Sequence, residues 1–198
     1  GLAPTTAAVL GLPLLRAMRA RYPDVRLHLV ESMSGHVSTM LNARQLDLAV
    51  LFSTDPARRW STMPLLEERL YYIRTRRDVK GEPPARVRAA ALKGVPLIMP
   101  TGGHGLRSAM DVVFSRARIQ PTVVVEIDSL SMLMDAVEAG LGGSLQPWSA
   151  VSRYSDATER FALSELSDPL ARRRNVLCSL SDDELSPAAL ATRVVLAD

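Results

Sequence analysis

Four short polar segments have the residue types that bind small anions. Each is expected at the N-terminus of a helix, where backbone N–H groups, a small hydroxyl and the positive end of the helix dipole are available. Gathered together, such termini would form a pocket for a carboxylate, a sulfonate or a phosphate. Each segment could equally be an ordinary N-cap, and the sequence leaves both interpretations open. The segments are Thr5-Thr6, Ser34-Gly35-His36, Thr101 to Gly105 and Ser129-Leu130-Ser131.

The third segment, Thr101-Gly102-Gly103-His104-Gly105, is a glycine-rich loop. It matches neither the P-loop pattern GxxxxGK[ST] nor the dinucleotide fingerprint GxGxxG. We interpret it as a loop that faces a ligand, with a simple turn as the alternative. Arg107 follows closely, and its planar guanidinium could pair with an anionic ligand or lie on the surface.

The chain offers no convincing set of catalytic or metal-binding residues. His28, His36 and His104 lack the spacing of metal ligands, and Cys178 stands alone in an apolar run, where a buried structural thiol is expected. Neither GxSxG nor HExxH occurs. The sequence therefore predicts a protein that is not an enzyme and that uses no metal and no cofactor.

Composition favours a water-soluble α/β protein. The 198 residues are 47% hydrophobic and 23% charged, which suffices for one large domain or two small lobes. The net charge is +3, but basic and acidic residues are interspersed along the chain, which indicates a solvated surface rather than a nucleic-acid face. A single cysteine suits a reducing cytoplasm. No apolar run approaches the roughly 20 residues of a membrane span.

Hydrophobic patterning predicts strands that alternate with helices. Pro13 should kink the first helix or start it again, Ser129 or Ser131 should cap a helix that Gly140 closes, and Ser186-Pro187 should begin the last one. We expect a loop over 53–61. The order implies a parallel-sheet α/β protein of two similar lobes, joined by crossing strands near 69–73 and 171–176. The predicted strands are 25–30, 48–52, 63–73, 96–99, 122–127, 143–145, 161–166 and 175–180.

An ordered set of motifs resembles the effector-binding domain of LysR-type transcriptional regulators, over essentially the whole chain. The Ser34-Gly35-His36 turn and the Pro4-Thr5 start are most similar to regulators of nitrogen assimilation and aromatic degradation. The matching residues are Gly1-Leu2, Thr5, Leu12 to Leu15, Tyr22 to Val25, Glu31, Leu41, Leu46 to Ala49, Glu68, Leu70, Pro96 to Ile98, Arg107, Ser129, Val137 to Gly142 and Leu145-Gln146-Pro147.

The resemblance implies a periplasmic-binding-protein-like fold of the second type, with two Rossmann-like lobes around a central cleft and crossing hinge strands. Lobe I would comprise 1–72 and 172–198, and lobe II 73–171. In the family the effector contacts the helix N-termini named above. That nominates Thr5, Thr6, Ser34, Gly35, Thr101, Gly102, Ser129 and Gln146, to which the residues themselves add His36, His104 and Arg107.

The resemblance also implies partners. Family domains pair in an antiparallel dimer, and two dimers form a tetramer. The winged helix-turn-helix that binds DNA precedes this region in the family and is absent from these residues, so DNA would be contacted only through that missing domain, and no membrane is involved.

The expected function is to sense a small organic anion and mediate self-association in a cytoplasmic bacterial regulator. A solute-binding protein of a transport system is the alternative, because it shares the fold. Two residues depart from the family, which more often has apolar side chains at positions 143 and 146. Gly143 removes a side chain, and Gln146 adds a polar group that argues against an entirely apolar effector.

Overall fold

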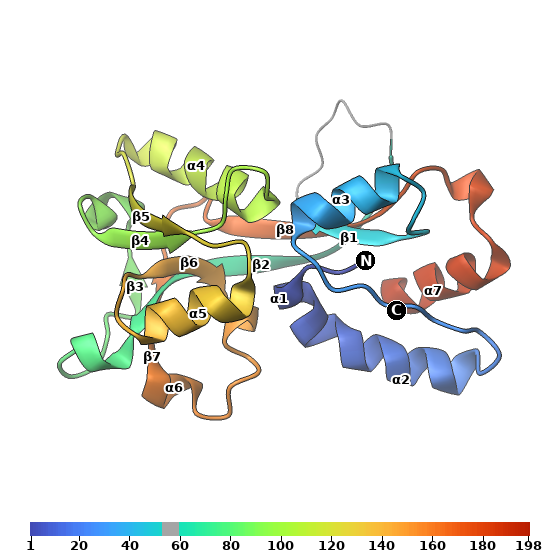
Figure 1. Ribbon diagram of the computed structural model, residues 1–198, viewed down its shortest axis with the longest axis horizontal. Helices are drawn as coiled ribbons and strands as arrows, with labels where there is room; N and C mark the ends of the chain where they lie inside the picture. The colour runs from blue at the N-terminus through green and yellow to red at the C-terminus, as the bar shows by residue number, and fades with distance from the viewer. Residues whose placement is uncertain (53–59) are drawn as a thin grey trace. The chain divides into compact units, whose positions relative to one another are not determined.

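A computed structural model of the chain describes residues 1–52 and 60–198. They form two compact units, each described separately below (Figure 1). Unit 1 comprises Gly1–Glu67 and Arg174–Asp198, and unit 2 comprises Glu68–Arg173. The loop expected over 53–61 lies largely outside the described residues.

Helices and strands alternate along the chain, as the patterning predicts. The α-helices are α1 (Pro4–Thr6), α2 (Leu12–Arg21), α3 (Ser34–Asn42), α4 (Gly105–Ala117), α5 (Leu130–Glu138), α6 (Ala157–Arg160) and α7 (Pro187–Ala197). The strands are β1 (Ala49–Phe52), β2 (Ser61–Thr75), β3 (Arg86–Val87), β4 (Pro96–Met99), β5 (Thr122–Glu126), β6 (Ser144–Pro147), β7 (Phe161–Leu166) and β8 (Arg172–Ser179).

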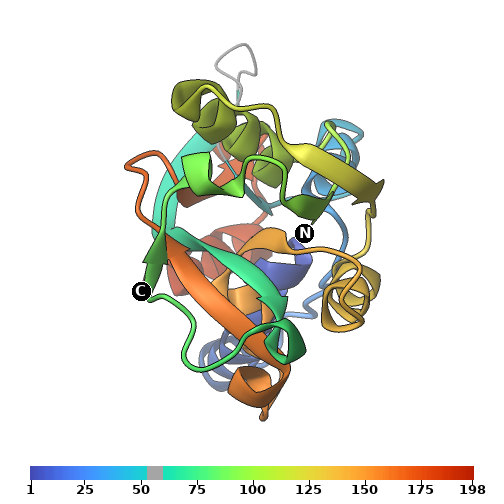
Figure 2. The same ribbon diagram turned by 90° about the vertical axis from the view of Figure 1, so that its left-hand side faces the viewer.

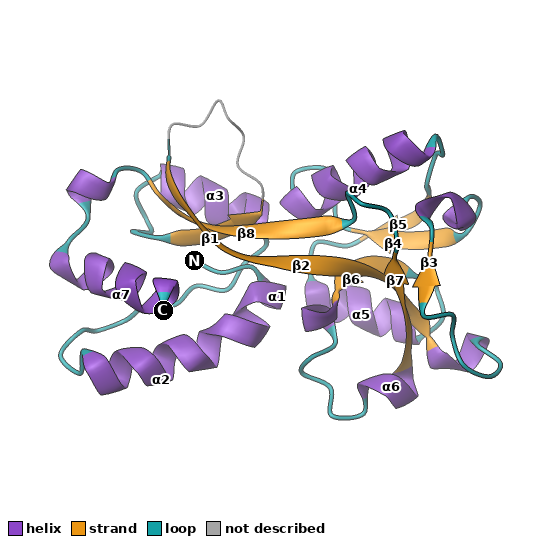
Figure 3. Ribbon diagram, turned by 180° about the vertical axis from the view of Figure 1, so that it is seen from behind, coloured by secondary structure: helices purple, strands orange, loops and turns teal. Residues whose placement is uncertain are grey.

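Unit 1 is built on the antiparallel pair of β1 and β8, in which Ala49 lies opposite Cys178. Helix α3 covers one face of this pair, and α2 and α7 lie on the other (Figures 1 and 3). Val37 and Leu41 of α3 are completely buried against β1. The burial of this apolar stripe fixes the start of α3, which carries Ser34, Gly35 and His36.

Unit 2 places its two long helices on opposite faces of β4. Leu97 and Met99 belong to one core cluster with α4, whereas Ile98, which points the other way, packs with α5. Strand β4 pairs in parallel with β5 and is bridged in parallel to Gly143, just before β6. The antiparallel pair of β2 and β7 forms the other part of the unit (Figure 2).

Two long strands, β2 and β8, pass from one unit to the other (Figure 3). The units divide at 67/68 within β2 and at 173/174 within β8. The sequence predicted lobe boundaries at 72/73 and 171/172, which fall within β2 and at the start of β8. The lobe boundaries at 72/73 and 171/172 stay predictions.

Two expectations about strands are wrong. The sheets are mixed rather than parallel, because β2 pairs antiparallel with β6 and β7 while β3 and β7 run parallel. The segment 25–30 is extended but forms no strand. Its main-chain hydrogen bonds run from the Leu2 N–H to the Val30 carbonyl and from the Val25 N–H to the Tyr22 carbonyl, and the two do not make a ladder.

Local helix signals are mostly confirmed. The Ser129 hydroxyl accepts from the Met132 N–H, Ser186 caps α7 in the same way, and Gly140 ends α5 with a φ of 81°. Pro13 lies at the start of α2, which follows a π-helical turn over Ala7–Gly11. Thr5 and Thr6 are not caps, because the helix begins earlier, at Pro4.

Candidate functional site

Unit 2 brings two of the predicted anion-binding segments to one edge. Strands β4 and β5 are parallel, so their carboxyl ends lie side by side. The Thr101 loop follows β4, and Ser129 follows β5 at the N-terminus of α5. Strand β6, which carries Gln146, is joined to β4 through the parallel bridge of Leu97 and Gly143.

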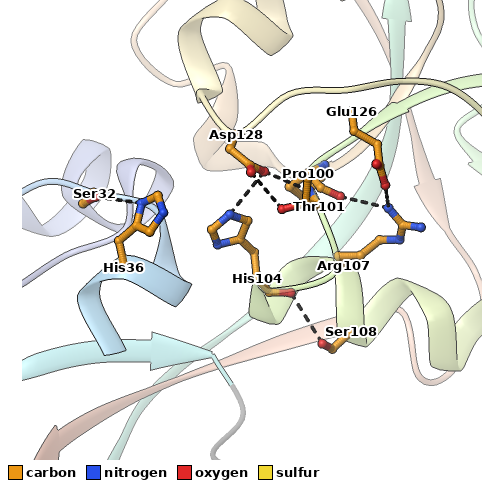
Figure 4. A network of polar contacts seen from close by, with 9 residues as sticks. All are labelled: Ser32, His36, Pro100, Thr101, His104, Arg107, Ser108, Glu126 and Asp128. Atoms are coloured by element: carbon orange, nitrogen blue, oxygen red, sulfur yellow. Dashed lines mark hydrogen bonds and ion pairs between the residues drawn. The ribbon is translucent and has the colours of Figure 1, made fainter. Parts of the chain in front are cut away.

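Asp128, which the sequence analysis missed, holds this edge together (Figure 4). Its Oδ1 accepts from the Thr101 N–H at 2.8 Å, and its Oδ2 accepts from the Thr101 hydroxyl at 2.8 Å. The Nε2 atom of the buried His104 lies 3.2 Å from Oδ1. The expected anion-binding loop is thus anchored by a carboxylate of the chain itself. The sequence did contain a signal for this anchor, because Asp128 lies between a predicted strand and Ser129, the predicted cap of the next helix.

The pKa of Asp128 has a consequence for acid stability. Burial by itself would raise this pKa, but the hydrogen bonds from Thr101 and the attraction of His104 hold it below its ordinary value of 3.8. The ionised Asp128 carboxylate therefore makes its full contribution to stability at pH values above 3.8. That contribution is lost as the pH falls through the lower pKa that Asp128 has in the folded state.

Asp128→Asn is expected to lower the free energy of unfolding by on the order of 1 kcal/mol at pH 7, since the carboxylate is partly exposed. The difference from wild type should shrink below pH 4. Urea denaturation between pH 3 and 7 measures it, with Asp135→Asn on the exposed face of α5 as the control. If wild type and Asp128→Asn differ in unfolding free energy by the same amount across this pH range, the ionised Asp128 carboxylate is not what stabilises the loop.

Two other predicted residues of unit 2 already have partners. Arg107 donates to Glu126 at 2.7 Å and to the Pro100 carbonyl at 3.0 Å (Figure 4). It also donates to Asp111 at 3.1 Å. Through these contacts Arg107 links α4 to the start of the Thr101 loop and to the end of β5. Gln146 is buried and donates through Nε2 to the Ser144 hydroxyl at 3.4 Å. Neither contact tests ligand binding, which stays a prediction for both.

Unit 1 brings its predicted residues together through Leu2. The Leu2 carbonyl accepts from the Ser32 N–H, and each of these residues precedes a helix start by two positions. The N-termini of α1 and α3 therefore begin at the same end of the unit. Buried Thr6 donates to Asn175 Oδ1 of β8 at 3.0 Å, and the Ser32 Oγ lies 3.5 Å from His36 Nδ1 (Figure 4). Sequence reasoning missed Asn175.

A cavity of about 170 Å³ in unit 1 does not contain the predicted residues. It lies between the extended segment 25–29 and residues 45–50, and its far wall is α7. Its ionisable side chains are Arg26, His28 and Asp47. This cavity is therefore distinct from the anion-binding segments predicted from the sequence.

Cys178 is buried, as expected for a structural thiol. Burial raises the pKa of the Cys178 thiol to about 12, so the reactive thiolate is scarce at neutral pH. We expect less than a tenth of the thiol in the folded protein to react with a thiol-specific disulfide reagent within an hour at pH 7.5. The same protein unfolded in guanidinium should react fully. Rapid reaction of the folded protein would contradict its inert role.

Within residues 1–52 and 60–198, no three His, Cys, Asp or Glu side chains are grouped so that they could hold a metal ion. None of the helices in that part of the chain has the length and hydropathy that a membrane span requires.

The family model of the LysR substrate-binding domain matches residues 1–198. The chain belongs to this family. The resemblance noted from the sequence motifs is thereby confirmed. The two units, the strands that connect them and the helix N-termini in each unit agree with what that resemblance implied.

Individual relatives agree with this assignment. The nitrogen assimilation regulatory protein nac of Klebsiella aerogenes is 32% identical over 197 residues, which cover 99% of this chain and 63% of that protein. The effector-binding domain of QuiR in complex with shikimate superposes with a TM-score of 0.85 at 17% identity, covering 100% of this chain and 93% of QuiR. The regulatory domain of Synechocystis PCC6803 CcmR in complex with 2-PG gives a TM-score of 0.86 at 20% identity, with coverages of 99% and 93%.

These similarities confirm the two-lobed, periplasmic-binding-protein-like fold of the LysR family. They favour a domain of a transcription regulator over the solute-binding alternative. The similarity to nac also agrees with the expectation drawn from the Ser34-Gly35-His36 turn. The chain spans less than two thirds of the length of nac.

Proposed function

We propose that the full-length protein is a cytoplasmic LysR-type transcription regulator and that this chain is its domain for effector sensing and self-association. The similarity to nac over 99% of the chain carries this proposal. DNA would be bound by a winged helix-turn-helix outside these 198 residues, and the domains would pair as antiparallel dimers that form a tetramer. An effector that prefers one state by about 1–3 kcal/mol is sufficient to alter DNA binding.

The proposed effector is a small organic anion, and the edge of unit 2 supports this class. The N-termini of α4 and α5 lie at this edge, where the polar groups include the Gly102 N–H group and the exposed Ser129 hydroxyl, which also caps α5. A side chain added at Gly102 would meet nothing within 4 Å, so a ligand has access. Asp128 already occupies the Thr101 donors. We therefore assign Thr101 and His104 to positioning of the loop, and Gly102 and Ser129 to direct contact.

The polar residues of unit 1 are proposed as a second group of candidate effector contacts. Ser34, Gly35 and His36 lie in the first turn of α3, and Thr5 and Thr6 lie in the adjacent start of the first helix. The hydrogen bond from Thr6 to Asn175 fixes the first helix to β8, so that its N-terminus is held in place. Gln146 and Arg107 remain candidate ligand contacts of unit 2.

Calorimetry against a panel of carboxylates and sulfonates tests the site. Once a ligand is found, Thr101→Val and Ser129→Ala should each weaken binding about tenfold, because the first removes the hydroxyl that orders the loop and the second removes a hydroxyl assigned to direct contact. Ser115→Ala, on the exposed far end of α4, is the matched control and should bind like wild type. If neither substitution changes affinity, the effector binds elsewhere.

The regulatory role is tested separately with the full-length protein. Binding to its promoter DNA should change when the same ligand is added, even if the ligand site is assigned wrongly. A helix-turn-helix encoded upstream of Gly1 supports the proposal. An export signal in its place would overturn it in favour of a solute-binding protein.

A further inference from the structure

A second cavity, of about 160 Å³, lies in unit 2 and is lined by residues of β2, β3, β7 and β8 and of the loop that follows β7. A water molecule takes roughly 30 Å³ in the liquid, so the cavity has room for about five. It contains none of the residues discussed as effector contacts. Its ionisable lining consists of Arg69, Arg86, Arg172, Glu165 and Asp168.

The ladder fixes the spacing of these charges. Arg86 of β3 lies directly opposite Glu165 of β7 in the parallel register. On the other edge of β7, Tyr71 of β2 lies opposite Glu165. Arg69 is two positions before Tyr71, so its side chain lies on the same face of the sheet as those of Tyr71 and Glu165. Two guanidinium groups from neighbouring strands therefore converge on one carboxylate.

Arg69 and Arg86 both lie near the same oxygen atom of the Glu165 carboxylate. Glu165 Oε1 accepts from Arg69 Nη1 at 2.7 Å, while Arg86 Nη2 lies 3.9 Å from the same oxygen, beyond hydrogen-bond distance. The Asp168 carboxylate is engaged elsewhere, because its Oδ2 accepts from the Ala89 N–H at 2.7 Å. Three arginines thus line a cavity with two acids, and the formal charge of the lining is +1.

We propose that this cavity binds a small phosphate-like oxyanion, with Arg69 and Arg86 as the main donors and Arg172 completing the lining. Guanidinium groups offer paired N–H donors that match the oxygens of such an anion. An anion here would complete the hydrogen bonding of Arg86, which Glu165 does not reach. The site is separate from the proposed effector residues, so its failure would leave that proposal untouched.

Nuclear magnetic resonance with inorganic phosphate tests the site on the 198-residue chain, with chloride added to hold the ionic strength constant. Phosphate should shift the amide signals of Glu165 to Ala171 in a saturable way. Arg86→Gln should weaken binding about three- to tenfold, because it removes one guanidinium. Glu165→Gln should tighten it, because it removes the competing carboxylate.

Two control variants separate a site from a general charge effect. Arg116→Gln removes an exposed charge on α4, and Glu159→Gln removes one on α6. Both should bind phosphate like wild type. The proposal is overturned if no saturable shift appears at Glu165 to Ala171, or if the two controls change the affinity as much as Arg86→Gln and Glu165→Gln do. Thermal denaturation of each variant shows that it is folded.

Discussion

Glu68→Ala is expected to lower the free energy of unfolding by about 3–5 kcal/mol, because it removes a carboxylate that pairs with a buried arginine. Arg173 is 2% exposed, and its Nε donates to Glu68 Oε2 at 3.0 Å. Burial lowers the pKa of the Arg173 guanidinium, while Glu68 opposes that shift. The second carboxylate oxygen accepts from the Ser149 hydroxyl at 2.6 Å, so the substitution also removes that bond.

The neighbouring residue on β2 provides a matched control. Glu67 pairs with Arg174 at 3.0 Å, but that arginine side chain is 80% exposed. Glu67→Ala should therefore cost about 1 kcal/mol or less. Urea denaturation of both variants makes the comparison, and Glu68→Gln serves if Glu68→Ala does not fold. Equal losses at the two positions would show that burial of Arg173 does not govern the effect.

Replacing the whole pair gives a further check on the same argument. Glu68→Leu combined with Arg173→Met removes both charges, so no unpaired ion remains. The double variant should recover most of the stability that Glu68→Ala loses, because an apolar pair often substitutes for a buried ion pair at little cost. A double variant as unstable as the single one would point to lost packing instead.

Gly143→Ala is expected to destabilise unit 2 by about 1–3 kcal/mol through overpacking. A Cβ atom at this position would lie 2.3 Å from Cε2 of the Tyr72 ring. The glycine itself cannot retreat, because its N–H donates to the Pro96 carbonyl and its own carbonyl accepts from the Ile98 N–H. The Tyr72 ring, which is buried, must therefore move.

The same substitution should weaken effector binding, since Gly143 leads directly into β6 and Gln146. Gly11→Ala is the control, because an added side chain there meets nothing within 4 Å. Tyr72→Leu combined with Gly143→Ala tests the cause. The double variant should be more stable than the sum of the two single losses predicts, and additive losses would show that the ring is not the obstacle.

The departure at position 143 illustrates how sequence and structure complement each other. The sequence showed a glycine where the family more often has an apolar side chain, but it offered no reason. The structure supplies the reason, because the Tyr72 ring occupies the space that a side chain would need. The ring belongs to a residue 71 positions earlier in the chain, which no local pattern reveals.

The sequence by itself determined the family and the local features of the fold. Helix caps at Ser129 and Ser186, the restart of the first helix near Pro13 and the long strand β2 depend on neighbouring residues, and all are found. The same holds for three of the four polar segments, which lie at the N-termini of α3, α4 and α5. Thr5 and Thr6 were misplaced because the helix extends further back, to Pro4.

The tertiary structure alone decided which side chains meet. Thr101 and Asp128 are 27 positions apart, Glu68 and Arg173 are 105 apart, and Thr6 and Asn175 are 169 apart. Each pair is set by strand register and by packing between distant segments, for which a single sequence has no periodic signal. For the same reason the segment 25–30 has the composition of a strand without forming one, because a strand exists only when a partner supplies its ladder.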